Sequence, residues 1–404
     1  MRKTYALFGS WGWYGDNPKP GVNLCEYKDG KYKIIKSYYK GVVVGSALQR
    51  SSKDIVYFIN ETRDTEDLPH EGGYVYSAKI SEDGRSLKPM QRLKTYSPNP
   101  CYCVMDSKEE YLLIAHHASG QDYATKIYRD EKGKIRSRVE YDDAAVELIK
   151  IKKDGKLGEI CDFDCHEPDF PGKRSFIHGI FRIPGEDKFI AVDKGLNRLY
   201  CYGINRNLDR LILLDDIAIQ YNAAPKYLGF VPKTDLIYVC YELDPSCAIV
   251  KYDRETGKLT HVKDFPLQVR GEVMLGGQDF CFHPKKPICY GVFYGMTKEC
   301  AAEGFDVKKL NNSWSTWARN HRGGPSMVCA YDISDPLKPK IIQQISTQSG
   351  SMRRMDLTPD HKYILSFNTS SNDISRFRIE KDGTLTFLDK QQWHSPENVT
   401  YYTR

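Results

Sequence analysis

One phrase recurs along the chain: an apolar strand, a short polar turn and a second apolar strand. Between about residue 42 and residue 368 it reads VVVGSALQRSSKDIVYFINE, CYCVMDSKEEYLLIAHH, IHGIFRIPGEDKFIAVD, YLGFVPKTDLIYVCYE, DFCFHPKKPICYGVF and RMDLTPDHKYILSFN. Recurrence at roughly 45 to 55 residues is typical of repeat architectures, in which each unit buries its apolar face against the next. This repeat limits the possible folds more than any other feature of the chain.

Each phrase predicts two antiparallel strands, and the residues after it supply two more, as in RLYCYGINRNLDRLILLDDI and AIVKYDRETGKLTHVKDF. Four strands per unit predict a propeller blade. Near the N-terminus, TYALFGS, GVNLCEYKDG and KYKIIKSYY lack an innermost partner, and the C-terminal ENVTYYTR lacks a blade. Joining them leaves no free sheet edge between the chain ends. We therefore expect one all-β domain over residues 1–404, a seven-bladed β-propeller closed by both ends of the chain.

Two spacings between phrases are longer than the rest and predict insertions. In the first, about 121–172, TKIYRDEKGKIRSR and VELIKIKKDGKLGEI are expected to form outer strands. The second, about 296–325, is rich in charge, Asn and Trp and lacks period-two alternation. Long loops in compact domains are commonly binding elements, but a plain surface excursion is equally consistent with this sequence.

Composition excludes several classes of function. The net charge is +6, and Lys and Arg are scattered among the turns, so no nucleic-acid surface is predicted. No apolar run reaches membrane-spanning length, and the start MRKTYALFGSWGWYG lacks the apolar stretch of a signal peptide. The twelve cysteines lie mostly inside strands without framework spacing, which favours a reducing, cytoplasmic setting. Cys161, Cys165 and His166 lack a second cysteine pair, so neither a metal nor another cofactor is predicted; the oligomeric state stays open.

Candidate functional residues lie where the phrases begin and end, because the innermost strands of a propeller surround its central channel. Their starts carry Tyr102, His178, Lys226, Gln278, Asp279, Arg353 and Arg354. The second strands end near His116, His117, Asp193, Asn197 and Glu242. An unpaired buried polar group costs about 1–3 kcal/mol, so polar residues at equivalent places of apolar repeats indicate a site. The alternative is internal pairing, of His178 with Glu242 and of Asp193 with Asn197 and Arg198.

At these residues the chain resembles the seven-bladed propeller lactonase family, which includes bacterial 6-phosphogluconolactonases and fungal carboxymuconate cyclases. The resemblance rests on SFIHGIFRIPGEDKFIAVDKGLNRLYCYGI, NPCYCVMDSKEEYLLIAHHASG, AAPKYLGFVPKTDLIYVCYELD and SMRRMDLTPDHKYILSFNTSSNDISRFRIEKDGTLTF. It covers nearly the whole chain and implies the propeller fold, with a lactone or sugar acid as substrate.

The resemblance also assigns residues. His178 matches the second His of the family's His-Pro-His, and Glu242 matches the Glu of its Asn-Glu-Leu. Asp193, Gly195, Asn197 and Arg198 match its Asp-Leu-Gly loop, and Arg353 matches an Arg of the last blade. Lys226 stands where the family has Arg, beside Tyr227 in place of His, while Phe176 and Tyr102 replace two further His residues. Lysine offers a point charge where arginine offers a bidentate fork, so these departures predict either a different substrate or a loss of hydrolysis.

From these matches we expect metal-free hydrolysis of a small anionic sugar-acid lactone, with catalytic His178, Glu242, Lys226 and Arg353. His178 would act as general base, and Glu242 would orient it or share the proton transfer. Lys226 and Arg353 would stabilise the enolate or oxyanion and hold the substrate carboxylate or phosphate. The residues expected to bind substrate are Tyr102, His116, Asp193, Asn197, Arg354 and Asp279. Two alternatives stay open: a muconate-type cycloisomerase or sugar-acid isomerase or epimerase, and a non-catalytic scaffold that presents Trp314 and Trp317 to a protein partner.

Overall fold

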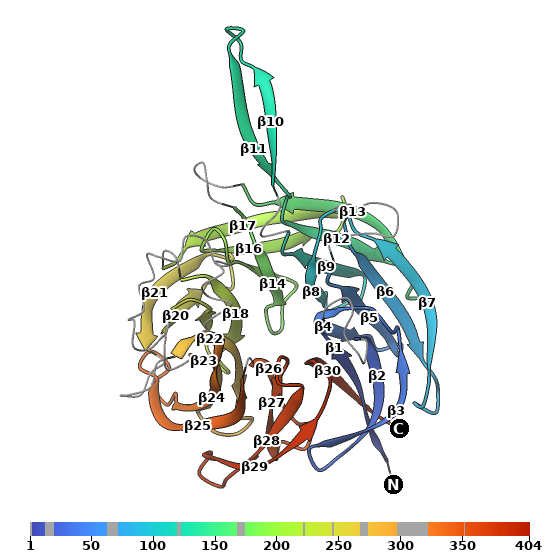
Figure 1. Cartoon of the computed structure of the whole chain (residues 1–404), viewed down its shortest axis with the longest axis vertical. Helices are drawn as coiled ribbons and strands as arrows, with labels where there is room; N and C mark the ends of the chain where they lie inside the picture. Colours follow the sequence, from blue (N-terminus) through green and yellow to red (C-terminus); the bar gives the residue numbers. More distant parts are fainter. Residues whose placement is uncertain are drawn as a thin grey trace.

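The structure is a computed structural model that describes residues 2–12, 20–62, 72–118, 123–167, 174–220, 223–244, 246–266, 274–296, 322–350 and 352–404. Within these residues the regular elements are β-strands, which form seven four-stranded antiparallel sheets around a channel and one separate hairpin (Figure 1). The predicted seven-bladed propeller is confirmed.

We number the blades by the order of their innermost strands, and each sheet runs from the channel outward. Blade 1 contains β4 (Val44–Arg50), β5 (Ile55–Asn60), β6 (Tyr74–Ile80) and β7 (Leu87–Lys94). Blade 2 contains β8 (Pro100–Met105), β9 (Tyr111–His116), β12 (Ala145–Ile151) and β13 (Leu157–Cys165). Blade 3 contains β14 (Ile177–Arg182), β15 (Phe189–Asp193), β16 (Arg198–Asn205) and β17 (Arg210–Ala218). Blade 4 contains β18 (Pro225–Phe230), β19 (Leu236–Tyr241), β20 (Ser246–Tyr252) and β21 (Leu259–Pro266).

The remaining blades complete the ring. Blade 5 contains β22 (Met274–Phe282), β23 (Ile288–Met296), β24 (Arg322–Asp332) and β25 (Lys340–Gly350). Blade 6 contains β26 (Met352–Leu357), β27 (Tyr363–Asn368), β28 (Asp373–Ile379) and β29 (Leu385–Gln392). Blade 7 contains β30 (Pro396–Thr403), β1 (Thr4–Ser10), β2 (Val22–Lys28) and β3 (Lys31–Tyr38).

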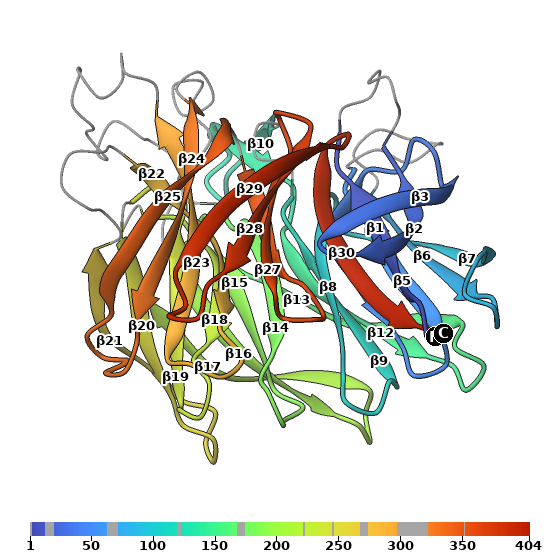
Figure 2. The same ribbon diagram turned by 90° about the horizontal axis from the view of Figure 1, so that it is seen from below.

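Blade 7 is built from both ends of the chain, as predicted. Its innermost strand β30 pairs antiparallel with β1, with Thr4 opposite Thr403, which brings the termini together (Figure 2). The β30 strand also contacts the innermost strands of its two neighbours, β26 and β4. Hydrogen bonds from β30 to β1 therefore close the ring without a covalent link.

The apolar core lies between blades, because alternate residues of each strand face one neighbouring blade or the other. One cluster between blades 6 and 7 shows the packing: the ring of Phe8 lies 4.7 Å from Trp393 and 5.0 Å from Phe367, measured between centroids. Apolar clusters of this kind between neighbouring blades stabilise their arrangement around the channel.

The first insertion is partly different from the prediction. The segment VELIKIKKDGKLGEI does form the outer strands β12 and β13, but TKIYRDEKGKIRSR does not join the blade. It forms the hairpin β10 (Tyr123–Arg129) and β11 (Ile135–Tyr141), which projects beyond the rim of the ring (Figure 1). Alternation predicted the strands correctly but not their partners. Most of the second insertion, with Trp314 and Trp317, lies outside the described residues.

Candidate active site

A β-bulge near the start of the innermost strand recurs in six blades. At each bulge the innermost strand has one more residue than the second strand opposite it. These extra residues are Cys101, His178, Lys226, Gln278, Arg353 and Glu397. In blade 1 the irregularity is wider and includes Ser46. A bulge bends its strand and re-aims the extra side chain, and the repeat places one such residue per blade at equivalent positions around the channel, although Cys101 packs in the apolar cluster between blades. We call these six residues and Ser46 the bulge ring.

The bulge corrects the predicted place of Tyr102. Cys101, not Tyr102, is the blade 2 equivalent of His178, because Pro100 pairs with His116 and Tyr102 with Ala115. Tyr102 instead belongs to the next position along each strand, together with Tyr227, Asp279 and Arg354. The expected substrate-binding residues Tyr102, Asp279 and Arg354 thus form a second layer, one residue deeper in the channel than the bulge ring.

His178 is buried among aromatic rings and charges. Its side chain is 2% exposed, and its ring packs edge-on against His117 at 5.3 Å and Tyr227 at 5.1 Å. Burial, followed by the nearby Lys226 and Lys194 ammonium groups, holds its pKa well below the usual value, so the imidazole is neutral at pH 7. Its Nδ1 atom has no hydrogen-bond partner among the described residues.

Glu242 joins two lysines of the site. Lys226 Nζ donates to Glu242 Oε1 at 3.0 Å, and Lys194 Nζ donates to Glu242 Oε2 at 2.7 Å. Lys226 also donates to Gln278 Oε1 at 2.6 Å. The Lys226, Lys194 and Glu242 side chains are at most 2% exposed. The described hydrogen bonds of Glu242 run to these lysines, so it fixes two ammonium groups, and its expected role toward His178 stays a prediction.

A second group of contacts connects Tyr227 to Arg353. Tyr227 Oη donates to Ser46 Oγ at 2.6 Å, and Ser46 Oγ donates to Glu397 Oε1 at 2.8 Å. Glu397 Oε2 lies 3.2 Å from Arg353 Nε. Since Tyr227 also contacts His178, contiguous side chains span the channel from the candidate base to the candidate cation.

Arg353 also faces a carboxyl group that titrates near neutrality. Its Nη2 lies 4.0 Å from Glu61 Oε1, and both side chains keep about 15% of their surface exposed. Burial raises the pKa of Glu61 to about 7, although the Arg353 charge opposes the rise. At 4.0 Å the Glu61–Arg353 ion pair is long. Because its pKa is about 7, Glu61 carries only part of its negative charge at pH 7.

In the second layer, Arg354 is held more tightly. Its Nε donates to Asp279 Oδ2 at 2.8 Å and its Nη1 to the Ser46 carbonyl oxygen at 2.8 Å. The guanidinium lies 4.8 Å from the centre of the Tyr227 ring and 5.8 Å from that of Tyr102. Arg354 thus supports the walls of the channel below Arg353.

Asp193 and Asn197 support a loop of blade 3. Asp193 Oδ1 accepts from the backbone N–H groups of Phe176, Gly195 and Leu196 at 2.9–3.0 Å. Asp193 Oδ2 accepts from Ser175 Oγ at 2.6 Å and lies 2.9 Å from His166 Nδ1. Asn197 Oδ1 accepts from the Ala224 N–H at 3.0 Å. Protein donors already occupy both Asp193 oxygens, but they are not the partners of the pairing alternative, since Arg198 pairs with Asp216. Substrate binding by Asp193 and Asn197 stays a prediction.

His116 also lies apart from the bulge ring. It is fully buried, with Nδ1 3.2 Å from the Ala145 carbonyl oxygen and Nε2 3.7 Å from Glu147 Oε2, both on β12. His166 is likewise engaged inside the protein: its Nε2 lies 2.8 Å from Tyr202 Oη. Among the described residues no group of three His, Cys, Asp or Glu is placed to hold a metal ion.

Three members of the site were missed by sequence reasoning: Lys194, Glu61 and Glu397. The signal was present for two of them, since Glu61, His117, Lys194 and Glu242 each directly follow the second strand of their blade. Glu397 lies at the bulge of β30, in the single strand that the C-terminus adds to blade 7. Aligning the phrases at their last strand residue would have identified Glu61 and Lys194.

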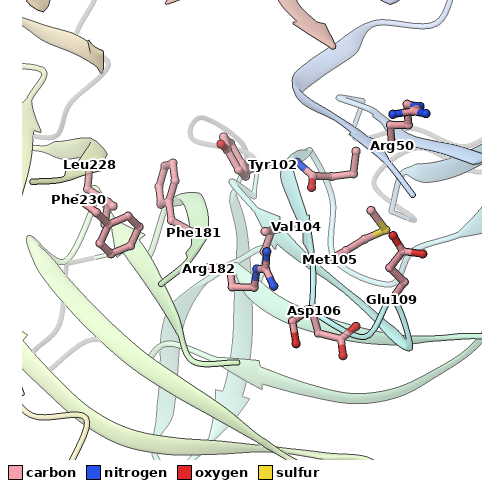
Figure 3. Close-up of a pocket in the computed structure, with 12 residues that line it drawn as sticks. Arg50, Tyr102, Val104, Met105, Asp106, Glu109, Phe181, Arg182, Leu228 and Phe230 are labelled. Carbon is pink, nitrogen blue, oxygen red and sulfur yellow. The ribbon is translucent and has the colours of Figure 1, made fainter. Parts of the chain in front are cut away.

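Among the described residues, one cavity of the channel is partly lined by the bulge ring and a second lies farther along the inner strands. The smaller, about 110 Å³, is lined by Ser46, Tyr102, Arg354, Asp356 and Glu397 among others. The larger, about 430 Å³, lies toward the far ends of β4, β8, β14 and β18, where Tyr102, Phe181 and Phe230 form an aromatic wall (Figure 3). Tyr102 and Gln49 line both cavities, so they lie between them, and the larger cavity also has charged walls formed by Arg50, Asp106, Glu109 and Arg182.

Comparison with known proteins agrees with this architecture. Residues 11–273 match the family described as lactonase, 7-bladed beta-propeller. The 6-phosphogluconolactonase of Bacillus subtilis is 21% identical over 194 residues, which cover 47% of this chain and 48% of that protein. The chain therefore spans about half the length of the curated relative that it matches.

Solved structures match along nearly the whole length. The periplasmic gluconolactonase of Pseudomonas aeruginosa superposes with a TM-score of 0.76 at 14% identity, covering 99% of both chains. A protein from Lactobacillus plantarum superposes with a TM-score of 0.74 at 17% identity, again covering 99% of both chains. At such identities these matches establish the fold. One of these neighbours is periplasmic by name, so the cytoplasmic setting stays a prediction for this chain; no helix of the described residues could span a membrane.

The repeated four-stranded sheets, the ring closed by β30 and the family match over well more than half of the sequence lead to one conclusion. This chain belongs to the lactonase family of seven-bladed β-propellers.

Proposed function

We propose that this protein is a lactone hydrolase that acts on a small anionic sugar-acid lactone at the bulge ring. One observation carries the proposal: His178, buried and neutral, lies at a bulge in the same ring as Lys226 and Arg353. Family membership supports the same reaction class. No metal is needed, because the ring contains a base and cations within one contiguous set of side chains.

His178 is the proposed general base. A lactone carbonyl is attacked by water, and a neutral imidazole removes the proton from that water in the transition state. Burial, and then the nearby Lys226 and Lys194, disfavour the imidazolium form. The proton is therefore passed on to the ring oxygen that leaves when the tetrahedral intermediate collapses. This environment suits a base that shuttles a proton and does not retain it.

Lys226 is the proposed oxyanion stabiliser. Its ammonium group is fixed by Glu242 and Gln278 before substrate arrives, and a preorganised cation stabilises developing charge without reorganisation. Glu242 and Lys194 are positioning residues in this scheme, because they hold Lys226 in place and set the charge around His178.

Arg353 is the proposed anchor for the carboxylate or phosphate of the substrate. Its pair with Glu61 is long, and Glu61 is partly protonated at pH 7. A substrate anion can therefore replace Glu61 at the guanidinium with little loss, in a bidentate arrangement that arginine favours. Replacement of Glu61 by the substrate anion would explain why the Glu61 carboxyl, with its raised pKa, lies beside Arg353.

The proposal is tested with a panel of aldonolactones, with and without a phosphate, whose hydrolysis is followed above the uncatalysed rate. We expect turnover of at least one anionic lactone, lost in His178→Ala and retained in His261→Gln, a histidine change on the outer strand β21. Equal rates for the two variants, or no turnover of any lactone, would reject the proposal.

The same samples separate the alternatives. Proton NMR in deuterated water detects cyclisation of muconates and exchange of the C–H next to a carboxyl group. C–H exchange without hydrolysis would indicate an isomerase, and cyclisation without hydrolysis would indicate a cycloisomerase. Either result would reject the lactonase proposal but leave His178 as the proposed base.

A further inference from the structure

The hairpin β10–β11 pairs with no strand of the blades among the described residues, although at its base the Arg174 guanidinium lies 4.2 Å from the centre of the Tyr141 ring. It forms a two-stranded sheet of its own and extends past the rim near β13 and β17 (Figure 1). A lone two-stranded hairpin is marginally stable in water unless one face is covered. Here the side chains from Ala124 to Arg129 and from Glu131 to Val139 are exposed on both faces. An arm of this kind needs an additional contact to hold its shape.

One face of the arm is apolar. Residues directly opposite in the ladder share a face, and Thr125 pairs with Val139 while Ile127 pairs with Ser137. Ile127, Val139 and Ile135 therefore lie on one face, with exposures of 72%, 46% and 67%. Arg129, directly opposite Ile135, also lies on this face, while the other face carries Tyr128 with Lys126, Arg136 and Arg138. Large aliphatic side chains so exposed in one patch indicate a surface that another protein covers.

A complementary surface lies on the rim at the base of the same arm. The outer strand β13 is the edge of blade 2, so one side of its backbone has no strand partner among the described residues. Its Phe163 is 63% exposed, and on the outer strand β17 of the neighbouring blade Leu213 is 48% exposed. Exposed edge strands are normally protected by charge, irregularity or a covering segment.

Charge matches these two surfaces to each other. The arm, residues 123–141, carries six basic and three acidic side chains, whereas β13 carries three acidic and no basic side chains. Two of the β13 carboxylates are already engaged, because Asp162 pairs with Arg210 and Asp164 accepts from Tyr202 Oη, so the match rests on net charge and on Glu159. Opposite charges on facing surfaces favour association and fix its register. Like charges on two facing arms would instead oppose arm-to-arm packing.

We propose that the arm binds the outer strand β13 of a second copy of this chain. Because arm and β13 adjoin on the same rim, two molecules placed rim to rim exchange arms around a two-fold axis, and each arm then covers Phe163 of its partner. Such an isologous contact closes on itself and leaves neither surface exposed. Strands of seven residues are about 24 Å long, so two arms and two acceptor strands provide on the order of 1,000 Å² of contact, enough for a specific weak dimer.

Sedimentation velocity of the intact chain over a wide concentration range tests the proposal. We expect a dimer whose dissociation constant rises about tenfold or more when Ile127→Asp is introduced on the apolar face. Tyr128→Asp adds the same charge to the opposite face one residue away and should leave the dimer intact. Circular dichroism and melting temperature should stay unchanged in both, because the arm is outside the blades.

A mixing experiment distinguishes arm exchange from other contacts. Ile127→Asp keeps an intact acceptor, and Phe163→Asp keeps an intact arm, so each alone should lose both contacts of the dimer. Mixed together, they regain one contact, and a heterodimer should form at lower concentration than either homodimer. An intact chain that stays monomeric, or one that instead cosediments with anionic lipid vesicles or duplex DNA, would overturn the proposal.

Discussion

His166 follows β13 and His178 lies in β14, and both are buried, but their hydrogen-bond environments differ. Each ring nitrogen of His166 lies within 2.9 Å of a protein oxygen, on Asp193 or Tyr202. His178 lies at a bulge, its Nδ1 lacks a described partner, and its pKa is lowered first by burial and then by two lysines. Full pairing is typical of structural polar groups, whereas an incompletely paired group in a constrained backbone indicates function. His166 and His178 are alike in residue type and burial, so their different hydrogen-bond pairing is what distinguishes their environments.

The largest expected effect tests that separation directly. His178→Gln should lower kcat by about a thousandfold and change the melting temperature little, whereas His166→Gln should lower the melting temperature and leave kcat of the folded enzyme nearly unchanged. Steady-state kinetics and thermal unfolding measure both. Comparable losses of kcat in the two variants would show that pairing does not separate the roles.

The next effect concerns Asp193, the acceptor beside His166. Asp193→Ala removes an acceptor from several buried donors, and we expect the free energy of unfolding to fall by about 3 kcal/mol. Urea unfolding measures this loss, and Asp193→Asn, which retains one acceptor oxygen, should lose less. If the alanine variant kept full stability but lost substrate affinity, Asp193 would belong to the binding site after all.

Lys226 is expected to affect both catalysis and the pKa of His178. Lys226→Gln removes the proposed oxyanion charge, and kcat should fall about a hundredfold. The pKa of His178 should move up toward its usual value, because one of the two lysines that depress it is lost. The pH profile of kcat/KM reports that shift, and an unmoved acidic limb would contradict the proposed coupling.

The smallest effect is the dependence of stability on pH. The folded-state pKa values of His178 and His117 lie below the ordinary value of about 6.5, first through burial. Below pH 6.5 the unfolded chain therefore binds more protons than the folded one, so stability falls as the pH drops, by up to about 1.4 kcal/mol per pH unit for each group. His178→Gln should reduce this slope between pH 6.5 and 5 in urea titrations. An identical slope in both proteins would mean that His178 is charged in the folded state.

Much of the fold could be read from the sequence because a propeller repeats one local pattern. Period-two alternation and polar turns identified the strands, and the unpartnered strands at the chain ends identified the closing blade. The same alternation failed for residues 123–141, since exposed and outer strands share a sequence pattern and differ only in their partners. The segment TKIYRDEKGKIRSR does not itself indicate that other residues already supply the outer strands of blade 2.

The residues of the site were identified less completely. Sequence determined that His178, Lys226 and Arg353 begin equivalent strands, and it placed Glu242 at the end of another. Only the tertiary structure decided that one-residue bulges turn these side chains toward each other, that Glu242 holds two lysines, and that Asp193 and His116 are engaged elsewhere. The physical reason is that strand periodicity is a local property of the chain, whereas hydrogen-bond pairing depends on which segments the closed ring brings together.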